Sequence, residues 1–330
     1  MEHEWTLTGM NIELTTCCPL RCPQCYCTLE GGKHIPLEKA LAALDEGAAL
    51  GVQSVQLSGG ETMCYPHLVE VIAHARKKGI EPDIAISGWH FDATALERLM
   101  SAGVDGIFVS INAPTEEMNR LSRDGFDLAI QALNTLKKAN YPKTYINWVM
   151  HRETAHTLPQ MYQLALDYGV KHLVILVPKP DAQKELLSFP TREQMEEANR
   201  FIRARRQEDI IRVEACFSQL LAMLGKNAFW TNLNRGLHKG CGAGLSSISV
   251  SVEGQFSPCR HLEEYETFPS LQDYWQQSKV LSHIRGLEKY EESLCTACEY
   301  GNYCRHCLAI NSKLHGKIAL GNNHCPIGVP

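Results

Sequence analysis

The sequence predicts an α/β fold built on a parallel sheet, followed by a smaller cysteine-rich region. Six apolar strand patterns alternate with helical patterns over residues 1–206, and the connections between them are short. Glycines stand where helices should end, at Gly51, Gly79, Gly103 and Gly169. Right-handed crossovers between such units give either an open doubly wound sheet or a curved partial barrel. Six units are two fewer than a full (β/α)8 barrel contains.

The predicted elements follow one another in regular order. Strands are expected at residues 11–15, 54–58, 83–87, 106–111, 144–150 and 172–177. Helices are expected at residues 37–50, 66–78, 93–101, 126–139, 157–168 and 192–206. The pattern then weakens, and residues 207–240 are predicted to form a linker or cover before a third segment, 241–330. Within that segment, alternation over 246–252, a turn at Glu253-Gly254 and a continuation over 255–258 predict a β-hairpin.

Composition and charge exclude several classes of protein. The 330 residues are 44% apolar and carry 32 Lys+Arg against 37 Asp+Glu, a formal net charge of −5. The apolar content excludes intrinsic disorder, and the charge argues against a nucleic-acid partner. No apolar run approaches the ~18 residues of a membrane span, and the N-terminus lacks a secretory signal pattern. We therefore expect a cytoplasmic protein with no membrane partner.

The 14 cysteines are grouped rather than dispersed. Five lie between Cys17 and Cys27, and seven lie between Cys241 and Cys325. Without an export signal, and in a chain long enough not to need disulfides, such groups indicate metal or redox chemistry. Cys64 and Cys216 stand alone and are predicted to be small buried hydrophobic residues, with a role as a metal ligand as the alternative for either.

The first group supplies three closely spaced thiols directly after the first predicted strand. Cys18, Cys22 and Cys25 have the spacing C-x3-C-x2-C, and ligands of parallel sheets gather at the carboxyl ends of strands. Three thiolates can hold one iron–sulfur cluster and leave one iron open for a substrate or cofactor. Alternatives are a zinc knuckle completed by Cys17 or Cys27, and a redox C-x2-C pair, which would leave Cys18 unexplained.

Polar residues recur at the ends of the other predicted strands. Each alone is more simply explained as a strand-end cap, but together they indicate a ligand site on one rim of the sheet. These residues are Gly59, Gly60 and Glu61 after the second strand, Ser87 at the end of the third, Ser110, Asn112 and Arg123 at or after the end of the fourth, Asn147 on the fifth with His151 near its end, and Pro178-Lys179-Pro180-Asp181 at the end of the sixth.

The second cysteine group has a compact core with the spacing C-x2-C-x5-C-x2-C. Its seven members are Cys241, Cys259, Cys295, Cys298, Cys304, Cys307 and Cys325. Five residues between two pairs are too few for a zinc ribbon, which needs roughly 15–20. Interleaved zinc sites remain an alternative to iron–sulfur clusters.

The two cysteine patterns together resemble the radical S-adenosylmethionine (SAM) superfamily with a C-terminal SPASM extension. The resemblance implies a partial (β/α)6 barrel of TIM type and a cysteine-rich SPASM domain that carries the hairpin. It also implies that Cys18, Cys22 and Cys25 hold a [4Fe–4S] cluster whose open iron chelates SAM. One-electron reduction then yields methionine and a 5′-deoxyadenosyl radical.

The resemblance extends to the strand ends. Gly59-Gly60-Glu61 is similar to the family motif that binds the SAM amino group. A second similarity is that of Ser110-Ile111-Asn112 and Arg123 to the family's S-x-D element and its arginine, which contact the ribose and carboxylate of SAM. Ser87 and Asn147 are further expected SAM contacts. The chain departs from the usual pattern at Gln24, where an aromatic residue is common, at Thr62, where proline is usual, and at Asn112, where aspartate is common.

The SPASM resemblance implies two auxiliary [4Fe–4S] clusters, which makes three clusters in all. Cys295, Cys298, Cys304 and Cys325 would hold one, and Cys241, Cys259 and Cys307 the other. The second set is one ligand short, so it has either an open iron or a further, unidentified ligand. Some relatives have an additional cysteine where this chain has Ser247.

The function implied is a radical SAM oxidoreductase that abstracts hydrogen from a peptide. The first hypothesis is a maturase of a ribosomally made peptide, forming a cross-link or an oxidised or epimerised residue. Alternatives are a sulfatase-maturase-like enzyme that oxidises Cys or Ser, an enzyme acting on a small molecule or tetrapyrrole, and a non-catalytic electron carrier. The expected protein partner is a flavodoxin- or ferredoxin-type reductant. Because about ten residues precede the first strand, a leader is expected to bind the barrel, the cluster domain or a separate leader-binding protein.

Overall fold

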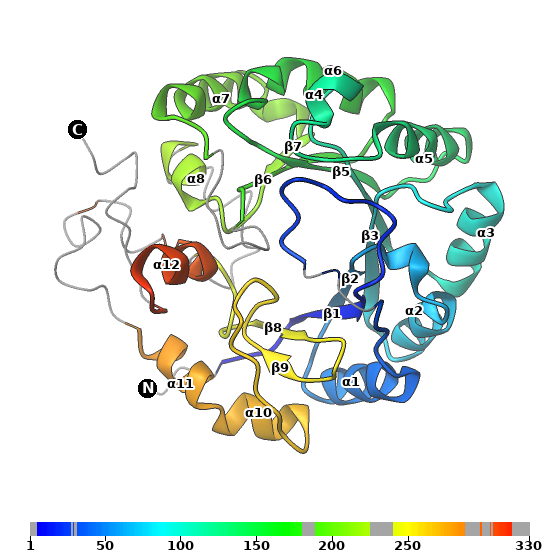
Figure 1. The fold of residues 1–330 in the computed structure, drawn as a ribbon, viewed down its shortest axis with the longest axis vertical. Helices are drawn as coiled ribbons and strands as arrows, with labels where there is room; N and C mark the ends of the chain where they lie inside the picture. Colours follow the sequence, from blue (N-terminus) through cyan, green and yellow to red (C-terminus); the bar gives the residue numbers. More distant parts are fainter. Residues whose placement is uncertain are drawn as a thin grey trace.

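The computed structural model describes residues 5–27, 29, 32–179, 189–224, 240–287, 298, 304 and 306–318. Within these residues one curved sheet of nine strands has the order β7-β6-β5-β4-β3-β2-β1-β8-β9 (Figure 1). The strands are β1 (Gly9–Thr15), β2 (Ser54–Gly59), β3 (Glu81–Ile86), β4 (Gly106–Ser110), β5 (Thr144–Val149), β6 (His172–Leu176), β7 (Ile211–Val213), β8 (Ser247–Val250) and β9 (Phe256–Ser257).

The first six strands form the predicted partial barrel. Each pairs in parallel with its neighbour in the sequence, from β1 to β6. Their bounds differ from the predicted ones by no more than two residues, which confirms the strand predictions. All carboxyl ends lie on one side, because the strands are parallel and follow one another in order. The polar residues predicted at strand ends therefore share one rim.

Helices cover the outer face of the curved sheet (Figure 1). Those of the barrel are α1 (Leu37–Ala49), α2 (Leu68–Lys77), α3 (Ala93–Ala102), α4 (Glu116–Asn119), α5 (Phe126–Lys138), α6 (Leu158–Asp167) and α7 (Arg192–Ala204), with 3-10 turns at Thr62–Cys64, Ala155–Thr157 and Arg206–Glu208. Apart from α4 and these short turns, each was predicted. Gly103 ends α3 with φ 91°, a left-handed conformation that glycine adopts without strain.

Several elements after residue 206 were not predicted, among them one strand and one helix before the hairpin and the helices that follow it. Strand β7 extends the sheet beyond β6, and helix α8 (Ser218–Leu224) follows it. Three residues are too few to show an alternating pattern. Nearly all of α8 is buried, including Ser218 and Gln219, so it lacks the polar face that marks a surface helix. Of the predicted linker or cover, residues 207–240, the stretch 225–239 lies outside the described residues.

The cysteine-rich region is joined directly to the barrel sheet. Strands β8 and β9 form the predicted antiparallel hairpin, and β8 also pairs in parallel with β1. Lys39 of α1 donates from Nζ to the backbone oxygen of Glu253 at 2.7 Å, which fixes the hairpin turn against the barrel. Three further helices follow: α10 (Leu271–Gln277), α11 (Lys279–Arg285) and α12 (Leu308–His315).

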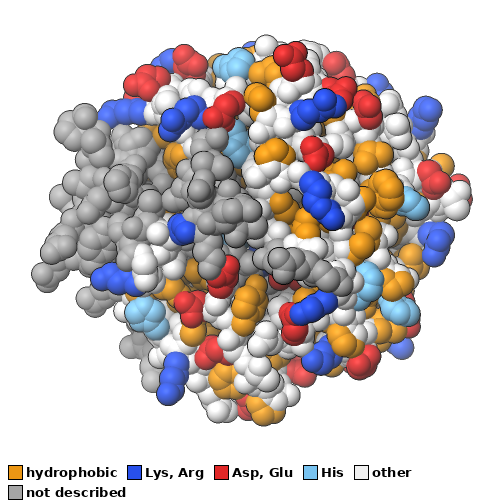
Figure 2. Space-filling model, viewed as in Figure 1, with side chains coloured by type: hydrophobic (Ala, Val, Ile, Leu, Met, Phe, Trp, Pro, Cys, Tyr) orange, Lys and Arg blue, Asp and Glu red, His pale blue; other side chains and the backbone are white. Residues whose placement is uncertain are grey.

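The surface in Figure 2 carries acidic and basic side chains interspersed with apolar ones over the described part of that face. Among the residues that the structure describes, none of the helices has both the length and the apolar character that a membrane span requires.

Candidate active site

A cavity of about 360 Å³ lies at the carboxyl ends of the barrel strands. Its lining brings together every predicted residue of the SAM site. These are Cys18, Cys22, Cys25, Gly59, Gly60, Glu61, Ser87, Ser110, Asn112, Arg123 and Asn147. Lys179 and Glu214 also line it, whereas His151 is buried elsewhere, and its burial lowers its pKa to about 4.

The three predicted cluster ligands lie on the loop after β1, which crosses the open centre of the arc of strands (Figure 1). A turn in which Cys25 N donates to Cys22 O at 3.1 Å keeps two of the thiols together. Hydrogen bonding with Cys27 lowers the pKa of Cys25 to about 7, while burial raises that of Cys18 to about 11. The three side chains fit a cluster with three protein ligands, since their thiols face one cavity.

Cys17 differs from its neighbour Cys18. Its side chain hydrogen-bonds to the thiol of Cys64 and, unlike that of Cys18, does not contribute to the described lining of the cavity. The backbone nitrogen of Cys17 is held by the Thr15 hydroxyl at 2.9 Å. The geometry therefore favours the spacing that begins at Cys18.

The glycine pair after β2 is required by a close approach of two backbones. A Cβ on Gly59 would overlap the carbonyl oxygen of Thr15, and a Cβ on Gly60 would overlap that of Cys17. The same approach forms hydrogen bonds from Gly60 N to Thr15 O at 2.7 Å and from Glu61 N to Cys17 O at 2.8 Å. The two glycines therefore allow the end of β2 to lie directly against the end of β1 and the start of the cysteine loop.

Glu61 ties the ends of β2 and β3 together. One carboxylate oxygen accepts from Met63 N at 3.0 Å, and the other accepts from Ser87 N at 2.8 Å and from the Ser87 hydroxyl. The side chain is 2% exposed, and this burial raises the pKa of its carboxyl group. Glu61 and Ser87 thus form one fixed unit that shapes the wall of the cavity.

Asn112 has a corresponding role between β4 and β5. Its side-chain nitrogen donates to the Ser122 hydroxyl at 3.0 Å, and its side-chain oxygen accepts from Val149 N at 3.2 Å. Arg123 donates from Nε to Ser110 O at 3.0 Å, which places both predicted residues at one edge of the cavity. The amide at position 112 therefore joins the end of β4 to β5 through its oxygen and to the connection between α4 and α5 through its nitrogen.

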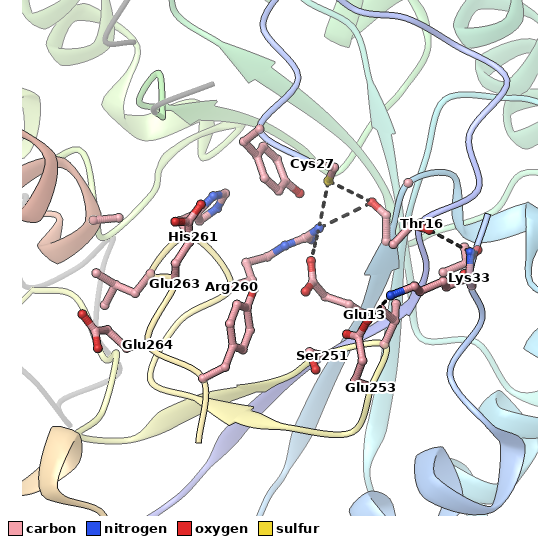
Figure 3. Close-up of a pocket in the computed structure, with 18 of the residues that line it drawn as sticks. Glu13, Thr16, Cys27, Lys33, Ser251, Glu253, Arg260, His261, Glu263 and Glu264 are labelled. Atoms are coloured by element: carbon pink, nitrogen blue, oxygen red, sulfur yellow. Dashed lines mark hydrogen bonds and ion pairs between the residues drawn. The ribbon is translucent and has the colours of Figure 1, made fainter. Parts of the chain in front are cut away.

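A second and larger cavity, of about 1220 Å³, adjoins the first. It lies between the cysteine loop, the hairpin with the segment after it, and α12 (Figure 3). Residues common to both linings are Tyr26, Cys27, Gly59, Gly60, Arg260 and His261. These six residues form the boundary between the two cavities.

Arg260 is the centre of that boundary. It extends from the segment after β9 towards Glu13 of β1 (Figure 3), and its terminal nitrogen lies 3.2 Å from a Glu13 carboxylate oxygen. The same nitrogen donates to Gly59 O at 3.4 Å, and the guanidinium lies 4.7 Å from the centre of the Tyr26 ring. His261 packs edge-on against Tyr26, with ring centres 4.4 Å apart. Sequence analysis missed these residues; the position of Arg260 and His261 directly after Cys259 was the available signal.

The predicted ligands of the second cysteine group are only partly described. Cys241 and Cys307 are buried, while Cys259, Cys298 and Cys304 are half-buried. Cys295 and Cys325 lie outside the described residues. Cys216, predicted to be a small hydrophobic residue, instead lies with its sulfur 3.7 Å from that of Cys241. In the described part of the chain, no three or more His, Cys, Asp or Glu side chains are arranged to hold a single metal ion.

A cysteine triad after the first strand of a parallel partial barrel, facing a strand-end cavity, defines a radical SAM enzyme. The family model of the Radical SAM superfamily matches residues 12–165. The chain is 30% identical over 304 residues to the PqqA peptide cyclase of Gluconobacter oxydans, covering 87% of this chain and 81% of that protein. It is also 30% identical to the PqqA peptide cyclase of Granulibacter bethesdensis, covering 88% and 79%. The chain therefore belongs to the radical SAM superfamily.

Solved structures share the fold over almost the whole chain. Streptococcus suis SuiB bound to precursor peptide SuiA has a TM-score of 0.79 at 17% identity, covering 97% of this chain and 76% of that one. Native anSMEcpe with bound AdoMet and Cp18Cys peptide has a TM-score of 0.75 at 16% identity, covering 96% and 93%. The predicted superfamily and the predicted partial barrel with a cysteine-rich C-terminal region are both confirmed.

Proposed function

We propose that this enzyme modifies a ribosomally made peptide by abstracting hydrogen from one of its residues. The observation that carries the proposal is the cavity of about 1220 Å³ beside the SAM cavity. Small-molecule sites occupy about 300–1,000 Å³. The volume of the smaller cavity, 360 Å³, lies within this range, whereas that of the larger cavity exceeds it. The names of the relatives, PqqA peptide cyclase, and the complex of SuiB with SuiA support a peptide occupant.

In this proposal the smaller cavity holds the cluster and SAM. Cys18, Cys22 and Cys25 are the cluster ligands, and the glycine pair with Glu61 shapes the site for the SAM amino group. Ser87, Ser110, Asn112, Arg123 and Asn147 complete the site. Glu61 and Asn112 act as positioning residues, because their side-chain atoms are already bonded to neighbouring strand ends. When bound, the cluster and SAM supply the 5′-deoxyadenosyl radical.

The larger cavity has a lining of mixed polar and apolar character, in which charged groups can meet the backbone and charged side chains of a peptide. Acidic groups are contributed by Glu253, Glu263 and Glu264, and basic ones by Lys33 and Lys313. Lys33 already pairs with Glu253 at 2.9 Å across the cavity wall (Figure 3). A peptide lying here would meet the reactive centre only past the boundary residues Tyr26, Arg260 and His261.

The C-terminal cysteines are proposed to hold two auxiliary [4Fe–4S] clusters. One set is Cys295, Cys298, Cys304 and Cys325, and the other includes Cys241, Cys259 and Cys307. Their role would be to accept the electron left on the substrate after hydrogen abstraction. A flavodoxin- or ferredoxin-type protein would reduce the first cluster, and a separate protein would present the leader of the precursor.

The test uses short precursor peptides encoded beside the gene, incubated anaerobically with the reconstituted enzyme, SAM and dithionite. We expect peptide-dependent formation of 5′-deoxyadenosine and a product that has lost two hydrogens, or one of unchanged mass that has exchanged a hydrogen with solvent. A synthetic sulfatase peptide with a target cysteine is the competing substrate. Modification of that peptide alone, or SAM cleavage that no peptide stimulates, would contradict the proposal.

A further inference from the structure

Cys216 lies in the second cysteine group, although it is remote from that group in sequence. Its sulfur is 3.7 Å from the Cys241 sulfur, and its thiol also hydrogen-bonds to Cys307. Cys307 in turn interacts electrostatically with Cys259. The four thiols come from four separate segments: the turn between β7 and α8, the approach to β8, the end of the hairpin, and the start of α12.

The turn that carries Cys216 is fixed by the barrel. Glu214 N donates to Ile175 O of β6 at 3.0 Å, and Phe217 N donates to Glu214 O at 3.0 Å. Phe217 and Ser218 are fully buried beneath it. The position of Cys216 is therefore set by the pairing of β7 with β6 and by the packing of α8.

The surroundings favour an anionic group at this place. Lys179 is 11% exposed in its side chain and interacts electrostatically with Cys216, Cys259 and Cys307. Its partner Glu214, at 2.7 Å, holds the ammonium group beside the thiols. Four thiolates around a doubly charged [4Fe–4S] core leave a net negative charge, which a neighbouring buried cation stabilises.

We infer that Cys216 is the fourth protein ligand, with Cys241, Cys259 and Cys307, of one auxiliary [4Fe–4S] cluster. Together with the seven C-terminal cysteines it makes eight thiols, the number that two fully ligated four-iron clusters need. With four ligands the cluster has no open iron, so it transfers electrons and does not bind substrate.

The inference rests on the proposed auxiliary clusters, so the experiment tests both separately. The parent is full-length protein with Cys18, Cys22 and Cys25 changed to Ala, so that only auxiliary clusters remain. We expect about eight irons per chain. Adding Cys216→Ala should lower this to about seven and produce the electron paramagnetic resonance signal of an oxidised three-iron cluster. Cys64→Ala, the matched control at the other solitary cysteine, should leave both readouts unchanged.

A second variant guards against misfolding. Cys216→Ser keeps an oxygen ligand, and we expect full iron with an altered spectrum of the reduced clusters. If both Cys216 variants have the iron content and the spectrum of the parent, the inference is wrong, but the proposed auxiliary clusters are still supported. A parent with zinc or no metal, or with a Cys216–Cys241 disulfide, would overturn the inference together with the proposed cluster.

Discussion

The barrel and the cysteine-rich region are specified by the sequence in different ways. In the barrel, repeated strands and helices bury a continuous core, and the rim that carries the site follows from the parallel order of the strands. In the C-terminal region, short strands and helices bring together thiols that are far apart in sequence. Periodicity therefore predicts the first region and the rim on which its site lies, whereas cysteine spacing alone does not show which thiols of the second region lie together.

The two regions meet at β1, which pairs with β2 on one side and β8 on the other. The same strand supplies Glu13 to the ion pair with Arg260 and leads into the loop with Cys18, Cys22 and Cys25. A change in the C-terminal region can thus reach the SAM cavity through a few residues. Substitutions within one region should therefore be distinguishable from substitutions that affect both.

The largest effect should follow loss of a barrel ligand. Cys18→Ala should abolish formation of 5′-deoxyadenosine, because the cluster loses one of its three protein ligands. The iron bound by the C-terminal cysteines should remain, since those ligands come from other segments. Cys17→Ala is the matched control and should retain most activity, because its thiol faces Cys64. Full activity of the Cys18 variant would assign the ligand to Cys17 instead.

Breaking the link between the regions should have the next largest effect. Removing one member of a buried ion pair costs about 3–5 kcal/mol, and the Arg260 and Glu13 side chains are 13% and 16% exposed. Arg260→Gln should lower the free energy of unfolding by about 3 kcal/mol and reduce product formation more than SAM cleavage. Denaturant unfolding of this variant, of Glu13→Gln and of the double variant checks the coupling. Strictly additive effects would show that the pair does not join the regions.

Gly60→Ala should disturb the barrel site alone. The added Cβ would collide with the carbonyl oxygen of Cys17, and the strain of forcing an extra carbon into packed surroundings is about 1–3 kcal/mol. We expect weaker SAM binding, measured anaerobically by calorimetry, with auxiliary iron unchanged. Gly9→Ala in β1 is the control, because its Cβ would meet ordinary contacts at 3.7 Å. Equal SAM affinity in both variants would contradict the tight approach of the two backbones.

The C-terminal region should affect the reaction without affecting SAM cleavage. Cys298→Ala removes a proposed auxiliary ligand far from the SAM cavity in sequence. We expect normal formation of 5′-deoxyadenosine and impaired formation of product, because the substrate radical loses its electron acceptor. The assay needs soluble variant with its remaining iron measured. Product formed at the normal rate would place this cluster outside the electron path.

The smallest effect should come from the opposite end of the barrel. Asp105 pairs with Lys143 and Arg76, each at 2.7 Å. Burial alone would raise the pKa of the Asp105 carboxyl group, but the two cationic partners outweigh burial and lower this pKa overall. The stabilisation is therefore present above the unfolded pKa of about 4 and is lost as pH falls further. Asp105→Asn should lower the free energy of unfolding by about 1–2 kcal/mol at neutral pH. In acid the variant and the parent should be equally stable, and SAM cleavage should be unchanged at neutral pH. A cost that persists at low pH would rule out charge as the cause.

Sequence analysis predicted the barrel and its rim because burial imposes a period on each element. The bounds of the predicted strands and longer helices were correct to within a few residues. Arg123 and Ser110, which were predicted to belong to one site, are in contact. Strand β7 and helix α8 were missed because one is too short and the other too buried to show a period.

The structural roles of individual side chains were harder to predict. No sequence pattern indicates that Asn112 joins β4 to β5 or that Arg260 pairs with Glu13. Both contacts form between segments that are distant in the sequence. Cys216 was assigned to the core for the same reason. It precedes Cys241 by 25 residues, and the two thiols are brought together by the pairing of β7 with β6, the packing of α8 and the pairing of β8 with β1.

The central claim is that the barrel generates a radical that acts directly on a peptide held between the two regions. Deuterium transfer tests it most directly. A precursor peptide deuterated at its carbon-bound positions is incubated anaerobically with the enzyme and SAM, and the 5′-deoxyadenosine is analysed by mass spectrometry. The account predicts deuterium in 5′-deoxyadenosine, in proportion to modified peptide. Modified peptide accompanied by 5′-deoxyadenosine free of deuterium would contradict it.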